Sequence, residues 1–376
     1  METSAKKIQL VDLVGLHARL KPELDAEIQK VIESAAFING AAVGELECAL
    51  AAYLGVRFAI GCGNGTDALQ IALMALGIGH GDEVITTPFS FAATVEAIFL
   101  VGATPRYVDI DPQTFNIHPE AIPAAITPRT KAILPVHLYG QPAAIDSIVE
   151  IAQQHHLFVI EDNAQSFGAS YKGKKAGTFG HISTTSFFPA KNLGAFGDGG
   201  AMFTNDEALF WKLKMIAQHG AKVRYQHERL GMNSRLDTLQ AAVLKVKLKY
   251  LDDFNCARRR AADLYDRYLA EARVQRPYRD PNAFHIFHQY TILLPEAGLR
   301  DELHKFLSAH GVPSTVHYPI PLHLQKAFVD ARYPKGSLPI AESVAERVLS
   351  LPMHTELDEE QIAFICEKIV AFVGKR

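Results

Sequence analysis

The segment KAILPVHLYGQPAAIDSIVEIAQQHHLFVIED, residues 131–162, contains two short apolar runs separated by a stretch with helical periodicity. The runs KAILPVHL and LFVIED are short enough to be buried strands, whereas AIDSIVEIAQQHH repeats its apolar residues every three or four positions. A connection of this length joins parallel strands, because antiparallel neighbours need only a short turn. The segment therefore predicts a βαβ unit.

The same alternation extends from about residue 56 to residue 220. VRFAIGC precedes TDALQIALMALG, DEVITT precedes FAATVEAIFLVG, and PRYVDI follows in turn. Repeated βαβ units predict an α/β domain with a large, mostly parallel sheet that helices cover on both faces. Ligands of such sheets bind beyond the carboxyl ends of the strands. The residues to consider are therefore those directly after each strand, which are 63–66, 89–91, 137–139, 162–165 and 186–191.

The sequence changes character after residue 234. Residues 235–270 are rich in charge and have helical periodicity, which predicts one long helix or two abutting helices. A strand-like run, FHIFHQYTILL (284–294), follows, then a helix around 299–310 and a final helix in DEEQIAFICEKIVAFV (358–373). We therefore expect two domains. Residues 1–240 would form an N-terminal arm and the large domain, and residues 241–376 a smaller C-terminal α/β domain entered through the long helix.

The composition is that of a soluble globular protein, with 48% hydrophobic and 21% charged residues in 376. A net charge of −3 gives no general attraction for nucleic acids or anionic membranes. The cysteines are scattered without a C-x-x-C pair, which favours reduced thiols over disulfides or a zinc site. The start, METSAKKIQLVDL, lacks the apolar run of a signal peptide, and no apolar stretch reaches membrane-spanning length. We expect a cytoplasmic protein that binds neither nucleic acids nor membranes.

The motif CGNGTDALQ (62–70) follows a predicted strand and opens a predicted helix. Free amides at such a helix start favour a phosphate, and Gly65 and Thr66 lie there. The alternative is an ordinary helix cap with Asn64 or Thr66 as the capping side chain. A dinucleotide site is disfavoured, because the third glycine of G-x-G-x-x-G is missing and no acidic residue is placed for a ribose.

The motif LFVIEDNAQSFGA (157–169) brings Glu161, Asp162 and Gln165 to the binding end of the sheet. A carboxylate just past a buried strand must be paired or neutralised. A metal is a weak explanation, because no histidine-rich partner is near, and we expect none. A cationic nitrogen on a ligand is the other explanation. His137 is the one histidine at a strand end of this sheet, and a site near a cofactor and a structural role both stay open for it.

The motif SFFPAKNLGAFGDGG (186–200) places Lys191 between an aromatic strand end and a glycine-rich loop. The lysine is either a solvated loop charge or a reactive amine held against a cofactor. The chain also offers a phosphate cup, a carboxylate for a ring nitrogen, and the aromatic segment PFSF (88–91) to cover a ring. Together these groups meet the demands of pyridoxal 5′-phosphate (PLP), to which the lysine binds covalently while the carboxylate holds the protonated ring nitrogen.

The motifs NGTDAL, IEDNAQSFGA, SFFPAKNLGAFGDGGA, GMNSRLDTLQAA and HYPIPLHL, in this order and spacing, resemble the DegT/DnrJ/EryC1/StrS family of sugar aminotransferases. The resemblance runs from about residue 9 to near the C-terminus. It implies the aspartate aminotransferase-like fold (PLP fold type I) and a homodimer whose subunits share their active sites. It also implies transfer of an amino group, usually from glutamate, to a keto sugar on a nucleotide.

The family motifs imply a role for each matching residue. Lys191 would bind PLP covalently, and Asp162 would pair with the ring nitrogen. The remaining cofactor contacts would be Gln165 near the 3-oxygen, Phe91 stacked on the ring, Gly65, Thr66 and Ser186 at the phosphate, and Asn233 at the phosphate from the neighbouring subunit. Family members with histidine in place of the lysine act as dehydratases, so Lys191 disfavours that branch.

Arg235, His317 and Tyr318 resemble the family's substrate-side residues, contributed across the dimer. The alternative for Arg235 is a salt bridge at the foot of the long helix. SFFPAK, NSRLDTLQAA and HYPIPLHL look most like the branch that aminates C3 of UDP-3-keto-N-acetylglucosaminuronate, for cell-surface glycan or antibiotic sugar synthesis. Amination at C3 of dTDP-3-keto-6-deoxyhexoses or at C4 are the alternatives. A non-catalytic PLP-binding regulator, or another PLP enzyme such as a lyase, also remains open.

Overall fold

The centre of the fold is a seven-stranded sheet, seen in a computed structural model that describes residues 8–374. The strands lie in the order β1 (Phe58–Cys62), β9 (Gly200–Thr204), β8 (Ile182–Ser186), β5 (Phe158–Asp162), β4 (Thr130–Leu134), β2 (Glu83–Thr86) and β3 (Thr104–Tyr107). Strand β9 runs antiparallel to β1 and β8, and the pairs from β8 to β3 are parallel. The predicted mixed, mostly parallel sheet is confirmed.

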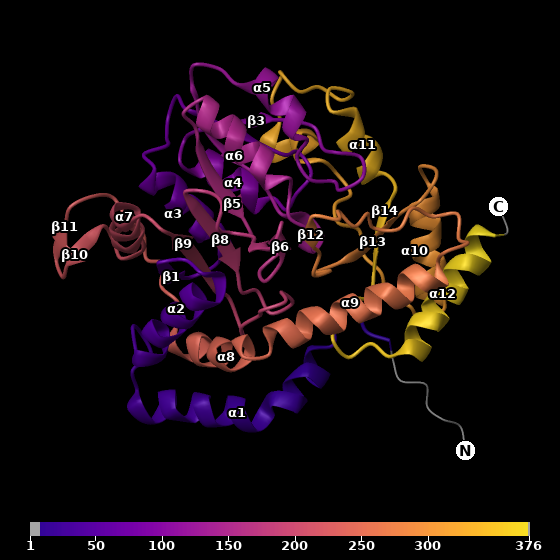
Figure 1. The fold of residues 1–376 in the computed structure, drawn as a ribbon, viewed down its shortest axis with the longest axis horizontal. Helices are drawn as coiled ribbons and strands as arrows, with labels where there is room; N and C mark the ends of the chain where they lie inside the picture. The colour runs from indigo at the N-terminus through magenta and orange to yellow at the C-terminus, as the bar shows by residue number, and fades with distance from the viewer. Residues whose placement is uncertain (1–7, 375–376) are drawn as a thin grey trace.

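Helices cover both faces of the sheet, as Figure 1 shows. The first face carries α3 (Gly65–Ala75), α4 (Ala93–Leu100) and α7 (Glu207–Ala217), and the second carries α2 (Ala41–Leu54), α6 (Ile145–Gln154) and α8 (Thr238–Leu248). Side chains alternate between the two cores along each strand: Ile160 packs in the first and Val159 in the second. Residues 131–162 form β4, α6 and β5 with β4 and β5 parallel, so the predicted βαβ unit is confirmed.

The N-terminal part lies on the second face. Helix α1 (Leu13–Ser34) packs Leu16, Leu20 and Leu24 against α8. The small elements are β6 (Ser170–Tyr171), β7 (Lys174–Lys175) and β12 (Ala283–Phe284) in one sheet, the hairpin β10 (Ala221–Val223) and β11 (Gln226–His227), helix α5 (Ile122–Ala125), and the 3-10 turns η1 (Pro119–Ala121), η2 (Leu138–Gly140), η3 (Leu322–Leu324) and η4 (Lys326–Phe328).

The charged stretch after residue 234 forms two abutting helices, α8 and α9 (Leu251–Tyr268), which lie nearly end to end in Figure 1. Helix α9 leads to a second core built with α10 (Leu299–Ala309), α12 (Glu359–Val373) and the antiparallel strands β13 (Tyr290–Leu293) and β14 (Val348–Leu351). The predicted boundary after residue 240 falls inside α8, and the division into domains stays a prediction.

The strand expected over 284–294 is shorter than predicted. Only Tyr290–Leu293 pairs with β14. The residues before it bond to the turn at 139–140 instead, since the Ile286 amide donates to the Gly140 carbonyl at 2.9 Å and the Gln289 amide to the Tyr139 carbonyl at 3.3 Å. Residues 285–289 therefore form an irregular segment that is hydrogen-bonded to the turn after β4.

A later segment of the chain returns to the large sheet. The Leu322 amide donates to the Pro88 carbonyl at 2.7 Å, and helix α11 (Pro339–Ala345) begins on the Asp109 carboxylate. Residues far apart in sequence therefore meet at the carboxyl end of the strands. Within residues 8–374, no helix has both the length and the apolar character that crossing a bilayer requires.

Candidate active site

A cavity of about 790 Å³ lies at the carboxyl end of the parallel strands. One wall comes from the loops that follow the strands and the other from residues 288–289, 315–318 and 350–353, together with Leu10 and Val11. Nine of the predicted site residues line it: Gly65, Thr66, Phe91, Asp162, Gln165, Ser186, Lys191, His317 and Tyr318. Asn233 and Arg235 do not line this chain's own cavity.

The start of α3 forms one end of the cavity. The Asn64 side chain accepts the Asp67 amide at 2.8 Å, so the expected cap is present. The amides of the first helical turn have no partner within a helix, and those of Gly65 and Thr66 lie at the cavity wall. A Cβ at Gly65 would lie 2.8 Å from the Ser186 Cβ, so only glycine lets the hydroxyl of Ser186 approach the helix start. This group of amides and a hydroxyl suits a phosphate.

Asp162, the last residue of β5, also lines the cavity and is only 4% exposed. Its Oδ2 accepts the hydroxyl of Thr94 at 2.9 Å, and its Oδ1 accepts the Ala164 amide at 3.2 Å. Burial raises the pKa of the Asp162 carboxyl, against the hydrogen bond from Thr94 and the charge of Lys191. A protonated ring nitrogen would provide the cationic partner that a buried carboxylate needs.

Lys191 also lies on the cavity wall. Burial lowers the pKa of its amine to about 8, although the Asp162 carboxylate acts in the opposite direction. A lysine of ordinary pKa is almost entirely protonated near neutral pH, whereas one of pKa about 8 has a substantial neutral fraction. The neutral amine is the form that attacks a carbonyl or accepts a proton.

The loop after Lys191 is held in place by hydrogen bonds and by close backbone packing. The Gly194 carbonyl accepts the amine of Lys247, a residue of α8 that is 1% exposed, and the Ala195 amide donates to Phe187 at 2.8 Å. A Cβ at Gly194 would collide with the Pro189 carbonyl, so the tight fold of this loop requires glycine. The glycine-rich loop therefore holds Lys191 in place.

Gln165 links the two walls of the cavity. Its Oε1 accepts the Tyr139 amide at 2.8 Å, and its Nε2 donates to the Tyr318 hydroxyl at 3.0 Å. The Tyr139 hydroxyl donates to the His317 carbonyl. Burial and the nearby charge of Lys191 lower the pKa of His317 to about 4, so this imidazole is neutral at physiological pH.

Phe91 presents its ring to the cavity. The side chain is 58% exposed, and its ring centroid lies 6.4 Å from that of Tyr318, with the planes tilted by 46°. An exposed aromatic ring on the wall of a cavity can cover the face of a flat ligand. This position agrees with the stacking role that the family motif implies.

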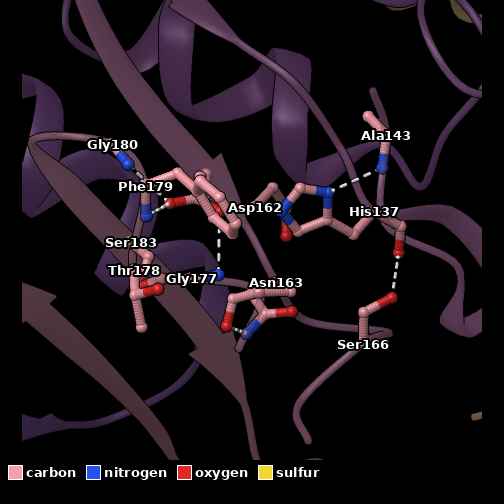
Figure 2. A network of polar contacts seen from close by, with 12 residues as sticks. His137, Ala143, Asp162, Asn163, Ser166, Gly177, Thr178, Phe179, Gly180 and Ser183 are labelled. Carbon is pink, nitrogen blue, oxygen red and sulfur yellow. Dashed lines mark hydrogen bonds and ion pairs between the residues drawn. The ribbon is translucent and has the colours of Figure 1, made fainter. Parts of the chain in front are cut away.

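His137 lies outside the cavity and is fully buried. Its Nε2 lies 3.0 Å from Glu161 Oε2, its Nδ1 accepts the Ala143 amide at 3.0 Å, and its carbonyl accepts the hydroxyl of Ser166, as Figure 2 shows for the last two. Glu161 also accepts amides of the loop 177–180. Burial alone would raise the pKa of Glu161, but these hydrogen bonds lower it. The structural role is the one that these contacts support.

Asn233 is exposed, and Arg235 is half-buried. Between them, Ser234 is buried and accepts the Gly63 amide at 2.9 Å, which fixes the segment beside the loop of the phosphate cup. Arg235 makes no ion pair with any of residues 8–374, so the salt bridge considered as its alternative role is not formed there.

The sequence did not indicate several residues of the cavity. Thr94 holds Asp162, and His288 and Gln289 form part of the second wall. The adjacent polar residues His288 and Gln289 within the strand-like run FHIFHQYTILL were the available signal. No group of three His, Cys, Asp or Glu residues in the described part of the chain is arranged to bind a metal ion.

The donor set fits PLP. Helix-start amides and a hydroxyl suit its phosphate, the Asp162 carboxylate suits its ring nitrogen, and Lys191 and Phe91 line the same cavity. The close approach of Gly65 to Ser186, which a larger side chain would block, builds the phosphate end. The fold and the cavity together define a PLP-dependent enzyme with the aspartate aminotransferase-like fold.

Comparisons with known proteins agree with this class of enzyme. The model of the DegT/DnrJ/EryC1/StrS aminotransferase family matches residues 18–370. The chain is 49% identical over 359 residues to the UDP-2-acetamido-2-deoxy-3-oxo-D-glucuronate aminotransferase of Pseudomonas aeruginosa, covering 96% of this chain and 98% of that protein. It is 50% identical over 368 residues to a Geobacillus stearothermophilus protein called "pleiotropic regulatory protein", covering 97% and 98%.

The crystal structure of S. venezuelae DesV in complex with a ketimine intermediate superposes with a TM-score of 0.95 at 40% identity, covering 98% of this chain and 99% of that one. The chain therefore belongs to the DegT/DnrJ/EryC1/StrS aminotransferase family. The predicted family, fold, cofactor and transaminase activity are confirmed.

Proposed function

We propose that this aminotransferase moves an amino group from glutamate to C3 of UDP-2-acetamido-2-deoxy-3-oxo-glucuronate, a step in amino-sugar supply for cell-surface glycans. The observation that carries the transfer itself is the Lys191 amine, with a pKa of about 8, in a cavity that also contains Asp162. The P. aeruginosa relative, named for this sugar, supports the choice of substrate.

PLP, when bound, supplies the electron sink that lets an amino group pass between two carbon skeletons. The Asp162 carboxylate would hold the proton on the ring nitrogen, and Gly65, Thr66 and Ser186 would hold the phosphate. The Lys191 Nζ removes the proton from Cα of glutamate and delivers a proton to C3 of the sugar. The low pKa of Lys191 supports both roles, since the amine can gain and lose a proton near neutral pH.

The sites are shared between the subunits of a homodimer in this proposal. Asn233 is exposed and Arg235 is half-buried, and both lie outside their own chain's cavity. Arg235 also makes no ion pair with the described residues. These observations support a role of both residues in the partner subunit's cavity. Arg235 would bind the sugar carboxylate, for which its planar guanidinium is suited. The protein would work in the cytoplasm, where free thiols such as the buried Cys62 and Cys366 stay reduced.

A regulator that binds PLP without turnover is the second candidate, because one close relative is called a regulatory protein. This chain, however, has in its cavity the lysine and the carboxylate that catalysis needs, Lys191 and Asp162. Addition of glutamate to the PLP-loaded protein distinguishes the two candidates. An enzyme converts the bound PLP to pyridoxamine phosphate and loses its yellow colour, whereas a regulator without turnover stays yellow.

The substrate is tested by running the reaction backward with 2-oxoglutarate. The panel contains UDP-linked 3-amino-N-acetylhexosaminuronate, a dTDP-linked 3-amino-3,6-dideoxyhexose and a C4-amino sugar nucleotide. We expect the uronate to win by at least about tenfold in kcat/KM, equivalent to about 1.4 kcal/mol, and Arg235→Lys to lose most of that preference. Faster turnover of the dTDP sugar would overturn the uronate assignment and leave the transaminase intact.

A further inference from the structure

His288 is a cavity residue without a role so far. It comes from the irregular segment 285–289 and lines the cavity together with Gln289. Its Nδ1 lies 3.2 Å from Oδ1 of Asn192, the residue directly after Lys191. Its Nε2 bonds to no atom of residues 8–374.

The neighbours of Asn192 determine where the imidazole proton lies. The Asn192 Nδ2 lies 3.4 Å from the Ile286 carbonyl and 2.7 Å from Asn255 Oδ1. A backbone carbonyl only accepts, so the Asn192 atom that faces it is the amide nitrogen. The atom that faces His288 is then the amide oxygen, which also only accepts. The Nδ1 of His288 must therefore be the donor.

A second proton on His288 is disfavoured by its surroundings. Burial lowers the pKa of the imidazole well below its ordinary value, and the positive charges of Lys191 and Arg258 lower it further. With the one proton on Nδ1, the Nε2 atom carries a lone pair and only accepts hydrogen bonds.

We propose that His288 is a sugar-binding residue whose Nε2 accepts a hydrogen bond from a hydroxyl or amide N–H of the keto sugar. The inference rests on the proposed function, because it assigns a contact to that substrate. Gln289 is a second polar residue on this wall, which suits a polar ligand such as a sugar.

The same lone pair distinguishes the two substrates of the cavity. Glutamate carries two carboxylates, which an acceptor repels, whereas a sugar ring offers hydroxyl and amide donors. Removing Nε2 should therefore weaken the sugar half of the reaction and spare the glutamate half. A residue that acted on Lys191 or on the cofactor would affect both halves equally.

The experiment measures the two halves separately on the same enzyme form. Glutamate alone converts the PLP form of the enzyme to the pyridoxamine form, and so does an amino-sugar nucleotide alone. The rate of each half-reaction is measured from the loss of the yellow absorbance. The sugar is whichever nucleotide of the panel above the wild type converts fastest. His288→Phe removes both ring nitrogens at similar volume. We expect it to lower kcat/KM for the sugar by about tenfold, the usual size of one neutral hydrogen bond, with the glutamate value within about twofold.

Two further substitutions locate the acceptor. The terminal amide of His288→Gln reaches the position of Nε2, and we expect it to retain most of the sugar activity. The amide of His288→Asn reaches only the position of Nδ1, and we expect it to resemble His288→Phe. The matched control is His285→Gln in the same segment, a buried histidine outside the cavity whose Nδ1 accepts the Phe287 amide at 3.0 Å. The control should change stability without a selective loss for the sugar.

A binding measurement completes the test. The pyridoxamine form of the enzyme cannot react with an amino-sugar nucleotide, so calorimetry directly gives the dissociation constant of that nucleotide. We expect His288→Phe to raise this dissociation constant by about tenfold. Equal loss in both halves, or unchanged sugar binding in a folded His288→Phe enzyme, would overturn the inference while the proposed function stands. A wild type that converts no sugar nucleotide would overturn both.

Discussion

The hydroxyl of Thr94 donates to Asp162 Oδ2 at 2.9 Å and lies 3.0 Å from the hydroxyl of Ser90. The single proton of Thr94 is used by Asp162, so the Ser90 hydroxyl donates to Thr94. A short chain of hydroxyls from α4 and its preceding loop thus stabilises the charged form of the carboxylate that pairs with the cofactor. Burial, which raises the pKa of Asp162, is thereby partly offset.

Thr94→Val should raise the pKa of Asp162 further, because it removes a hydrogen bond to the charged form. More Asp162 is then protonated in acid, so the apoenzyme should bind PLP about tenfold more weakly at pH 6 and with a smaller loss at pH 8. Fluorescence titration of apoenzyme with PLP at both pH values measures this. Thr94→Ser keeps the hydroxyl and is the control. A valine variant indistinguishable from the serine variant would show that this hydroxyl is not needed.

Lys191 of the apoenzyme should react with amine reagents at unusually low pH. Its pKa of about 8 leaves about a quarter of the amine neutral at pH 7.5, against about a thousandth for an ordinary lysine. Competitive acetylation, read by mass spectrometry, should give a midpoint near pH 8. Asp162→Asn should move that midpoint to lower pH, because the carboxylate raises the lysine's pKa. A midpoint above pH 9.5, or one that rises in the asparagine variant, would contradict this assignment.

Mixed subunits should regain activity if the dimer shares its sites. Lys191→Ala and Asn233→Ala are each expected to be inactive. After exchange, half of the dimers are hybrids, and each hybrid has one site with both wild-type residues, so recovery of up to about a quarter of wild-type activity is expected. Mass spectrometry confirms that subunits exchanged. Verified hybrids without activity would argue that each site uses residues of one chain.

His137→Gln should affect stability rather than catalysis. The substitution alters a fully buried bond to the Glu161 carboxylate and should lower the free energy of unfolding by about 2–4 kcal/mol. The kcat per folded, PLP-loaded enzyme should stay within about twofold of wild type. Chemical denaturation and active-site titration give the two values. A fall in kcat at unchanged stability would instead place His137 in the reaction.

The sequence was sufficient to predict the centre of the site because three motifs follow strands directly. The order of strand, loop and helix forces Gly65, Asp162 and Lys191 to one edge of the sheet, whatever the rest of the chain does. The side on which a residue lies was not predictable. Glu161 and Asp162 are neighbours in one strand, so they face opposite sides, and only the fold shows that Asp162 faces the cavity and Glu161 faces His137.

The second wall was harder to predict, because it depends on contacts between distant segments. The run that contains His288 has the pattern of a strand, but its bonds to Tyr139 and Gly140 pull it into an irregular path and present the imidazole to the cavity. The sequence around Thr94 has the pattern of an ordinary helix, and nothing in it indicates the hydrogen bond to Asp162, which lies 68 positions away. Local patterns do not encode such contacts.

The cavity wall also joins an early and a late segment of the chain, since the Met353 amide donates to the Leu10 carbonyl at 3.2 Å and both residues line the cavity. Proteins are made from the N-terminus, and early parts begin to fold during synthesis. All seven strands of the large sheet have been made by residue 204, but the wall is complete only after Met353. Loading of the cofactor into a closed site is therefore an event of the nearly finished chain, not of the growing one.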